Sequence, residues 1–154
     1  MPKMRVYLAG PDVFSPNALE IGREKKRICS QYGFEGVSPL DANFDVLSEL
    51  VSQVEIGHKT FDLMVELMDS CDLVIANLTP FRGPSMDVGT AVEIGYMYGC
   101  GKPVFGYTNT VKDYSERVNP DGFFVESFGL VDNLMVEGPI YRTCAVVIRV
   151  DVPH

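Results

Sequence analysis

The chain has 154 residues, of which 46% are hydrophobic and 22% charged, and its formal net charge at pH 7 is −8. This length and composition predict one globular domain over residues 1–154 and exclude an intrinsically disordered protein. The acidic charge excludes a nucleic-acid polymer as partner, because phosphate backbones are bound by clustered Lys and Arg. A nucleoside carries no phosphate and is not excluded.

Short apolar runs and segments of helical period alternate along the chain. We expect strands over 4–9, 34–38, 73–76, 103–107 and 144–150, and helices over 18–32, 60–70 and 88–98. Weak helical spacing in 40–57 suggests a further helix, and 112–117 is expected to form a loop with a helical turn. This alternation predicts an α/β domain with a largely parallel sheet.

Cysteine usage and hydropathy indicate a cytoplasmic protein. The four cysteines lie far apart in the sequence and form no Cys-x-x-Cys pair. They predict reduced, buried thiols and no metal site. No apolar stretch approaches about 18 residues, and the first residues lead directly into a strand pattern, so we expect neither a membrane span nor a signal peptide.

The segment from Asp72 to Tyr107 has the pattern of a βαβ unit. Two short apolar runs flank a Pro- and Gly-rich loop (79–85) and a segment of helical period. In such units, ligands bind beyond the carboxyl ends of the strands. We therefore expect the loop carrying Asp87, and the start of the helix carrying Glu93, to face the ligand.

Asp87 and Glu93 are six positions apart, which on a continuous helix places them on different faces. They can converge only if Asp87 precedes the first turn, because helical side chains lean toward the amino end. Gly89 lies one turn before Glu93 and would leave space above its carboxylate. Gly95 and Gly99 follow, and each helical glycine costs about 1 kcal/mol relative to alanine, which suggests close strand packing or a ligand.

Two interpretations of these carboxylates stay open on the residues alone. In one, Asp87 is a plain N-cap and Glu93 is an edge residue that extends its carboxylate into solvent. In the other, Glu93 is an ionised nucleophile toward an anomeric carbon, favoured by the positive end of its helix, and Asp87 binds a sugar hydroxyl or handles a proton.

Several segments together resemble the nucleoside 2-deoxyribosyltransferase family. They are VYLAGP with Tyr7, CDLVIANLTPFRGPS, the D-V-G-x-x-x-E-x-G-Y spacing from Asp87 to Tyr96, GKPVFGYTN, and FGLVDNLM with Asn133 and Met135. They extend from Val6 to Met135, and the D-V-G-x-x-x-E-x-G-Y spacing is the specific part. The resemblance implies a three-layer, doubly wound fold of Rossmann or flavodoxin type, with a mostly parallel sheet and flanking helices.

The resemblance also implies a reaction and its residues. Glu93 takes the place of the nucleophile that attacks C1′ of a 2′-deoxynucleoside, giving a deoxyribosyl ester that a second base attacks with overall retention. Tyr7 takes the position that orients this glutamate, and Asp87 the position that holds the 5′-hydroxyl. Asn133, with Met135 close by, would reach in from a neighbouring subunit. The remaining residues expected at the substrate are Gly10, Asp62, Met64 and Gly89.

Two residues bear on the substrate. A carboxylate at Asp87 accepts a hydrogen bond from a free 5′-hydroxyl but repels a 5′-phosphate, so deoxynucleosides are expected to be preferred over monophosphates. Met64 departs from the family pattern, in which an Asp or Asn at that position meets the nucleobase. Asp62 is two helical positions away, about 200° around the axis, so a simple exchange of roles is not expected.

The leading interpretation is therefore transfer of 2-deoxyribose between purine and pyrimidine bases of nucleosides, as in nucleotide salvage. Hydrolysis of the same bond, in deoxynucleosides or their 5′-monophosphates, is one alternative. A nucleoside-binding protein with weakened catalysis, suggested by Met64, is another. The resemblance implies no cofactor, and a homo-oligomer, a dimer or higher, in which Asn133 and Met135 complete the neighbour's site.

Overall fold

The computed structural model describes residues 2–48, 50–144 and 146–152. Two compact units contain the chain: one comprises residues 1–8 and 12–72, and the other residues 9–11 and 73–154. The strand order is β2-β1-β3-β4-β5, the order of flavodoxin-like doubly wound sheets. The α/β class and the parallel sheet are thus confirmed, whereas the single domain stays a prediction.

The first unit contains two long helices and two parallel strands, of which β1 has only its last residue in the second unit. Their bounds are β1 (Arg5–Ala9), α1 (Ala18–Gln31), β2 (Glu35–Val37) and α2 (Gln53–Asp69). The register pairs Arg5 with Glu35 and Tyr7 with Val37. Helix α1 lies close against β2, because a Cβ on Gly36 would stand 3.0 Å from the Cα of Lys26.

The predicted helix over 40–57 is wrong for most of its length. Two short 3-10 helices, Pro39–Asp41 and Phe44–Leu47, occupy its first part, and α2 begins only at Gln53. Residue 49 lies outside the described residues. Ser38 and Asn43 accept hydrogen bonds from backbone N–H groups two residues ahead, a local alternative to a continuous helix.

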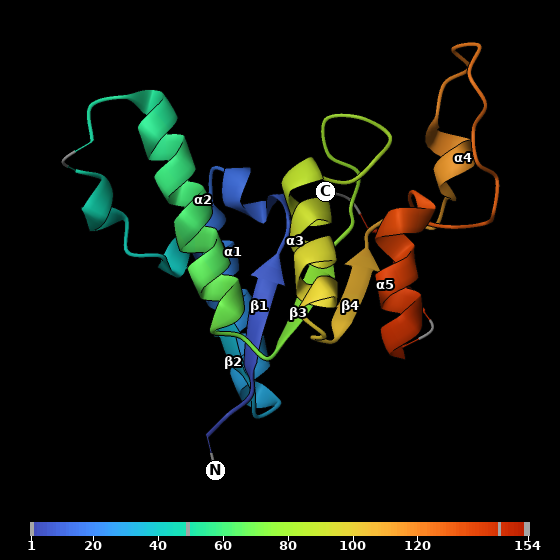
Figure 1. Cartoon of the computed structure of the whole chain (residues 1–154). Coiled ribbons are helices and arrows are strands. Elements are labelled where there is room, and N and C mark those ends of the chain that lie inside the picture. The colour runs from blue at the N-terminus through green and yellow to red at the C-terminus, as the bar shows by residue number, and fades with distance from the viewer. Residues whose placement is uncertain (1, 49, 145, 153–154) are drawn as a thin grey trace. The chain divides into compact units, whose positions relative to one another are not determined.

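The second unit carries the predicted βαβ unit and continues it. Its elements are β3 (Leu73–Asn77), α3 (Val88–Gly99), β4 (Val104–Thr108), α4 (Tyr114–Arg117), α5 (Leu134–Cys144) and β5 (Ile148–Arg149). Strands β3 and β4 pair in parallel from Val74 with Val104 to Asn77 with Tyr107. Figure 1 shows α3 and α5 beside these strands, and the unit's core includes the fully buried Ile94, Met97 and Ile140.

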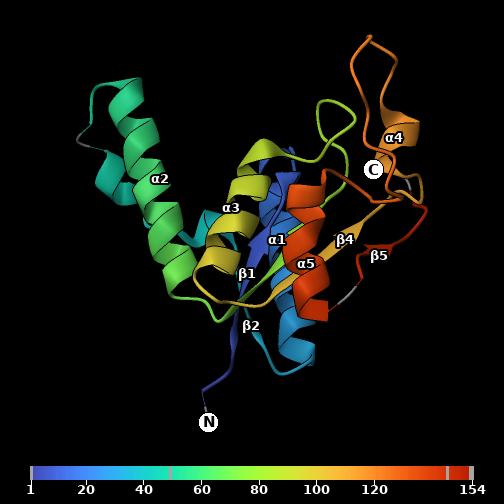
Figure 2. The same ribbon diagram turned by 45° about the vertical axis from the view of Figure 1, so that its right-hand side comes forward.

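Helix α5 is absent from the sequence prediction. Gly138 and Pro139 interrupt the pattern there, although Pro139 lies inside the helix. Of the predicted 144–150 strand, only Ile148–Arg149 forms one, and residue 145 lies outside the described residues. Figure 2 shows that the segment between α4 and α5 forms a long loop rather than a further layer.

The thiols are distributed differently from the prediction. Cys29 and Cys71 are buried, as expected, but Cys100 is exposed and Cys144 is only partly buried. Cys100 follows directly after the last residue of α3, where the helix ends at the surface. No group of three potential metal-ligating side chains occurs among the described residues. No helix in the described part of the chain is long and apolar enough to cross a membrane.

Gly106 in β4 sets how closely α5 packs on the sheet. A Cβ there would lie 2.6 Å from Cδ1 of Ile140 and 2.8 Å from Cδ1 of Leu78. We predict that Gly106→Ala lowers the free energy of unfolding by about 1–3 kcal/mol, because the added methyl overpacks this contact. Denaturant unfolding measures the change.

Gly57 provides the matched control, because a Cβ at this position in α2 meets nothing within 4 Å. Gly57→Ala should raise the free energy of unfolding by about 0.5–1 kcal/mol through helix propensity. Equal effects of the two substitutions would contradict the packing account.

Candidate active site

The loop between β3 and α3 leads from the carboxyl end of a parallel strand, where α/β folds bind ligands. Within it, Phe81 N–H donates to the Ser85 carbonyl at 2.9 Å, and Arg82 has a positive φ of 56°. This tight turn brings the chain back toward the amino end of α3. Asp87, which we expected to face the ligand, therefore lies where this ordered loop meets α3.

Asp87 is the N-cap of α3. Its Oδ2 accepts hydrogen bonds from Thr90 N–H at 2.9 Å and from Thr90 Oγ1 at 3.0 Å. Its backbone is extended, with φ −64° and ψ 132°, so the residue precedes the first helical turn. Asp87 therefore has the position before the helix that an approach of its side chain to Glu93 requires. In the part of the chain that the structure describes, these bonds use Oδ2, which leaves Oδ1 for another donor.

Gly89 makes room for this cap. A Cβ at Gly89 would lie 3.1 Å from Oδ2 of Asp87, closer than ordinary van der Waals contact. The glycine thus clears space for the Asp87 carboxylate. A Cβ at Gly95 or Gly99 meets nothing within 4 Å, so the close strand packing suggested for them is not found.

Glu93 is partly buried in the second turn of α3, as its sixth residue. Its neighbours along the helix alternate between core and surface, with Ile94 fully buried and Val92 64% exposed. The carboxylate is therefore not on the fully exposed side of the helix. The helix macrodipole acts mainly within the first turn, so it favours the anion at Asp87 more strongly than at Glu93.

Asp132 is a functional candidate that sequence reasoning missed. Its side chain is completely buried, and it accepts hydrogen bonds from Ser85 Oγ at 2.5 Å and from Met86 N–H at 2.8 Å. Arg117 stands 3.6 Å from its Oδ2. The partners lie 46 and 47 residues away in the sequence, so no local pattern marks them.

Asn133 and Met135 lie at the amino end of α5. Asn133 Oδ1 accepts from Met135 N–H at 3.0 Å, and its Nδ2 donates to Glu126 Oε2 at 3.2 Å. Asn133 is exposed and Met135 is 75% exposed. The side chains thus lie on the surface of the second unit, with Asn133 capping the helix that the sequence did not reveal.

The remaining predicted residues are placed as follows. In the first unit, the hydroxyl of Tyr7 is 3.8 Å from Sδ of Met64, a weak hydrogen bond to a thioether. Tyr7 is fully buried. Met64 is partly buried and Asp62 is exposed, as expected for residues on different sides of α2. Gly10, in the second unit, is buried just after β1.

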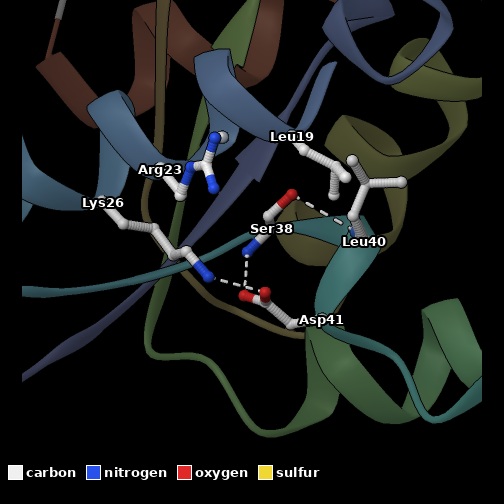
Figure 3. Close-up of a pocket in the computed structure, with 7 residues that line it drawn as sticks. Leu19, Arg23, Lys26, Ser38, Leu40 and Asp41 are labelled. Atoms are coloured by element: carbon white, nitrogen blue, oxygen red, sulfur yellow. Dashed lines mark hydrogen bonds and ion pairs between the residues drawn. The ribbon is translucent and has the colours of Figure 1, made fainter. Parts of the chain in front are cut away.

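A separate pocket of about 120 Å³ lies in the first unit, between α1 and the start of the 3-10 helix Pro39–Asp41 (Figure 3). Lys26 Nζ in its wall contacts Asp41 Oδ1 at 2.6 Å, and Asp41 Oδ2 accepts from Ser38 N–H at 2.8 Å. None of the predicted site residues lines this pocket. The Lys26–Asp41 ion pair joins the segment after β2 to α1.

The family model that matches the chain and a solved structure similar to it both describe 2-deoxyribosyltransferases. The model of the nucleoside 2-deoxyribosyltransferase family matches residues 6–135. A solved 2-deoxyribosyltransferase from Leishmania mexicana has a TM-score of 0.69 and 32% identity, covering 88% of this chain and 85% of that one. An uncharacterized protein from Schizosaccharomyces pombe is 40% identical over 159 residues, 86% of this chain and 75% of its own length.

A more distant structure agrees in fold. The 2-deoxyribosyltransferase from Bacillus psychrosaccharolyticus has a TM-score of 0.58 at 23% identity, covering 88% of this chain and 82% of that one. At this identity the likeness concerns the fold alone.

The capping role of Asp87 predicts a stability effect. We expect Asp87→Ala to lower the free energy of unfolding by about 1 kcal/mol, because Thr90 N–H loses its acceptor. Asp87→Ser keeps a capping oxygen and should remain within about 0.5 kcal/mol of the wild type. Denaturant unfolding of both variants is the measurement. An alanine variant as stable as the serine variant would mean that the cap contributes nothing.

Proposed function

The chain belongs to the nucleoside 2-deoxyribosyltransferase family, and from this premise we propose that it transfers 2-deoxyribose between nucleobases through a covalent intermediate on Glu93. The family and the likeness to the Leishmania mexicana enzyme indicate a deoxyribosyltransferase-type enzyme acting on nucleosides and bases. The observation that carries the finer proposal is the position of Glu93, which is partly buried in the second turn of α3, the helix whose N-cap ends the loop after β3.

The chemistry requires two displacements at C1′. A Glu93 carboxylate oxygen forms a bond to C1′ while the C1′–N bond breaks, and its electron pair leaves with the base, which takes up a proton. A nitrogen of a second base then attacks C1′, the C1′–O bond to Glu93 breaks to return the carboxylate, and the attacking base gives up a proton, which balances the one that the first base took up. Each step inverts the carbon, so the product keeps the β configuration. Met64 has no proton to give, so the leaving base must be protonated by another group or by water.

The sugar is proposed to be held by its 5′-hydroxyl. The Oδ1 of Asp87 is suited to accept this hydrogen bond, because the cap on α3 uses Oδ2. Asn133 and Met135, exposed at the start of α5, are suited to serve a neighbouring subunit's site. By the same resemblance, Tyr7 is proposed to orient the nucleophile.

Replacing the nucleophile should stop turnover. We predict that Glu93→Gln lowers kcat for base exchange by roughly a thousandfold or more, because an amide cannot form the ester. The free energy of unfolding should stay close to that of the wild type. Chromatography of products from a deoxynucleoside and a free acceptor base gives the rate. Glu20→Gln, at an exposed position on α1, is the control; a Glu93→Gln rate similar to the control's would refute the assignment.

The charge of Asp87 should set the preference between nucleosides and nucleotides. For Asp87→Ser, we expect the ratio of kcat/KM for a deoxynucleoside to that for its 5′-monophosphate to fall on the order of tenfold or more, because the repulsion of phosphate is removed. Serine keeps a helix-capping oxygen, so the effect is separated from loss of the cap. An unchanged ratio would count against Asp87 as the 5′-hydroxyl ligand.

Hydrolysis is the second candidate function, because water could resolve the same ester. A panel of acceptor bases with one deoxynucleoside donor distinguishes the two. Transfer predicts that new nucleosides accumulate with the acceptor and that little free sugar forms. Release of free deoxyribose at the same rate with and without an acceptor would favour the hydrolase.

A further inference from the structure

One buried carboxylate is bonded to both segments that carry the proposed sugar-binding residues. The Asp132 side chain is completely buried. Its Oδ1 accepts from Ser85 Oγ at 2.5 Å and from Asn133 N–H at 2.9 Å. Its Oδ2 accepts from Met86 N–H at 2.8 Å. The two oxygens thus bind the loop before α3 and the residue that begins the cap of α5.

Arg117 reinforces the same junction from the end of α4. Its Nε donates to the Pro84 carbonyl at 2.8 Å, and its Nη2 donates to the Val131 carbonyl at 2.5 Å. Burial lowers the pKa of this guanidinium, an effect that the neighbouring Asp132 carboxylate opposes. The side chain is only 9% exposed. Arg117 and Asp132 therefore form a buried pair, and in the part of the chain that the structure describes their other hydrogen bonds go to these loops or to the Lys112 carbonyl just before α4.

The residues bonded to Asp132 are adjacent in sequence to the proposed sugar ligands or are one of them. Met86, which donates to Asp132, is followed directly by Asp87, and Asn133 directly follows Asp132. A shift of the Met86 or Asn133 backbone therefore moves a proposed sugar ligand. Reacting groups displaced by about 1 Å can lose around a hundredfold in rate.

We propose that Asp132 is a positioning residue for recognition of the 5′-hydroxyl, holding Asp87 and Asn133 in place through the Met86 and Asn133 N–H groups. The inference rests on the proposed function. It goes beyond it by assigning substrate specificity to a residue that does not touch the substrate. Because Asn133 is proposed to serve a neighbouring subunit, the same carboxylate would support two sites.

Asp132→Asn is the sharpest substitution. An amide keeps the shape but has one acceptor oxygen. If that oxygen faces Met86 N–H and Arg117, the NH₂ group can donate to Ser85 Oγ, but Asn133 N–H loses its acceptor. The reverse orientation places the NH₂ group against Met86 N–H and the guanidinium. Either way, one of the two backbone anchors is lost while the volume is kept.

The test compares a 2′-deoxynucleoside with the 2′,5′-dideoxynucleoside of the same base, which lacks only the 5′-hydroxyl. The ratio of their kcat/KM values measures 5′-hydroxyl recognition. A ratio in the wild type on the order of tenfold to a hundredfold is expected from a hydrogen bond to a carboxylate. Asp132→Asn should lower this ratio by about tenfold, with a much smaller change in kcat/KM for the dideoxy substrate.

Arg27→Gln, on α1, is the control. It removes the exposed ion pair of Arg27 with Glu24, 2.7 Å long, on a helix that carries none of the proposed substrate residues. It should leave the ratio unchanged. If Asp132→Asn does not fold, Ser85→Ala removes one bond to the same carboxylate and should lower the ratio less, in the same direction.

The outcomes separate the two claims. A wild type that cleaves neither substrate contradicts the proposed function. A wild type that turns over both equally contradicts 5′-hydroxyl recognition, and the positioning role with it. If the wild type discriminates and Asp132→Asn lowers both kcat/KM values by the same factor, Asp132 is merely structural and the inference is wrong.

Discussion

The amino end of α3 is held by a carboxylate that does not meet solvent. Asp132 takes hydrogen bonds from Ser85 and Met86 in a loop without regular structure, and Arg117 binds the carbonyl of Pro84 in the same loop. Buried ion pairs often contribute little net stability, because desolvation offsets their attraction. Removing one partner is nevertheless costly, by about 3–5 kcal/mol, since it leaves a buried charge unpaired. The pair thus fixes a conformation more than it adds stability.

Because this loop is fixed, Asp87 can cap α3 with one carboxylate oxygen while the other stays available for the proposed sugar hydroxyl. Oδ2 caps α3 through Thr90, and Oδ1 is left for a ligand. Gly89 permits this arrangement, because a side chain there would press on the capping oxygen. The N-cap interpretation and the sugar-binding interpretation of Asp87 are therefore compatible. Glu93 lies beyond the reach of most of the helix dipole, so its role depends on its surroundings rather than on the helix end.

The parts of the fold that could be predicted are those with a local signal. The β3–α3–β4 unit was found because its apolar runs and turn residues alternate with the correct period. Helix α5 was missed because Gly138 and Pro139 have the composition of a turn, whereas tertiary packing of Ile140 against the Gly106 position stabilises the helix. The segment 40–57 has helical spacing, but local side-chain bonds favour short 3-10 turns in its first part.

In the candidate site, too, only the residues with a local sequence signal could be predicted. Asp87 and Glu93 could be identified because their spacing and the capping chemistry are local. Asp132 and Arg117 could not, because the bonds that join them to the loop before α3 link segments more than 30 residues apart and leave no periodicity in the sequence. The sequence shows that a glycine stands at position 89, but not why a larger side chain is disfavoured there. That depends on the position of the Asp87 carboxylate oxygen, which only the structure gives.

The most direct measurement of the central claim is to locate the sugar on the protein. A 2′-deoxy-2′-fluoro nucleoside destabilises the oxocarbenium-like transition states and should slow breakdown of the ester, so that peptide mass mapping after proteolysis can find the labelled residue. The account predicts one 2-deoxy-2-fluororibosyl group per chain, on the peptide containing Glu93. Binding of the compound without any covalent label, or a label on another residue, would contradict it.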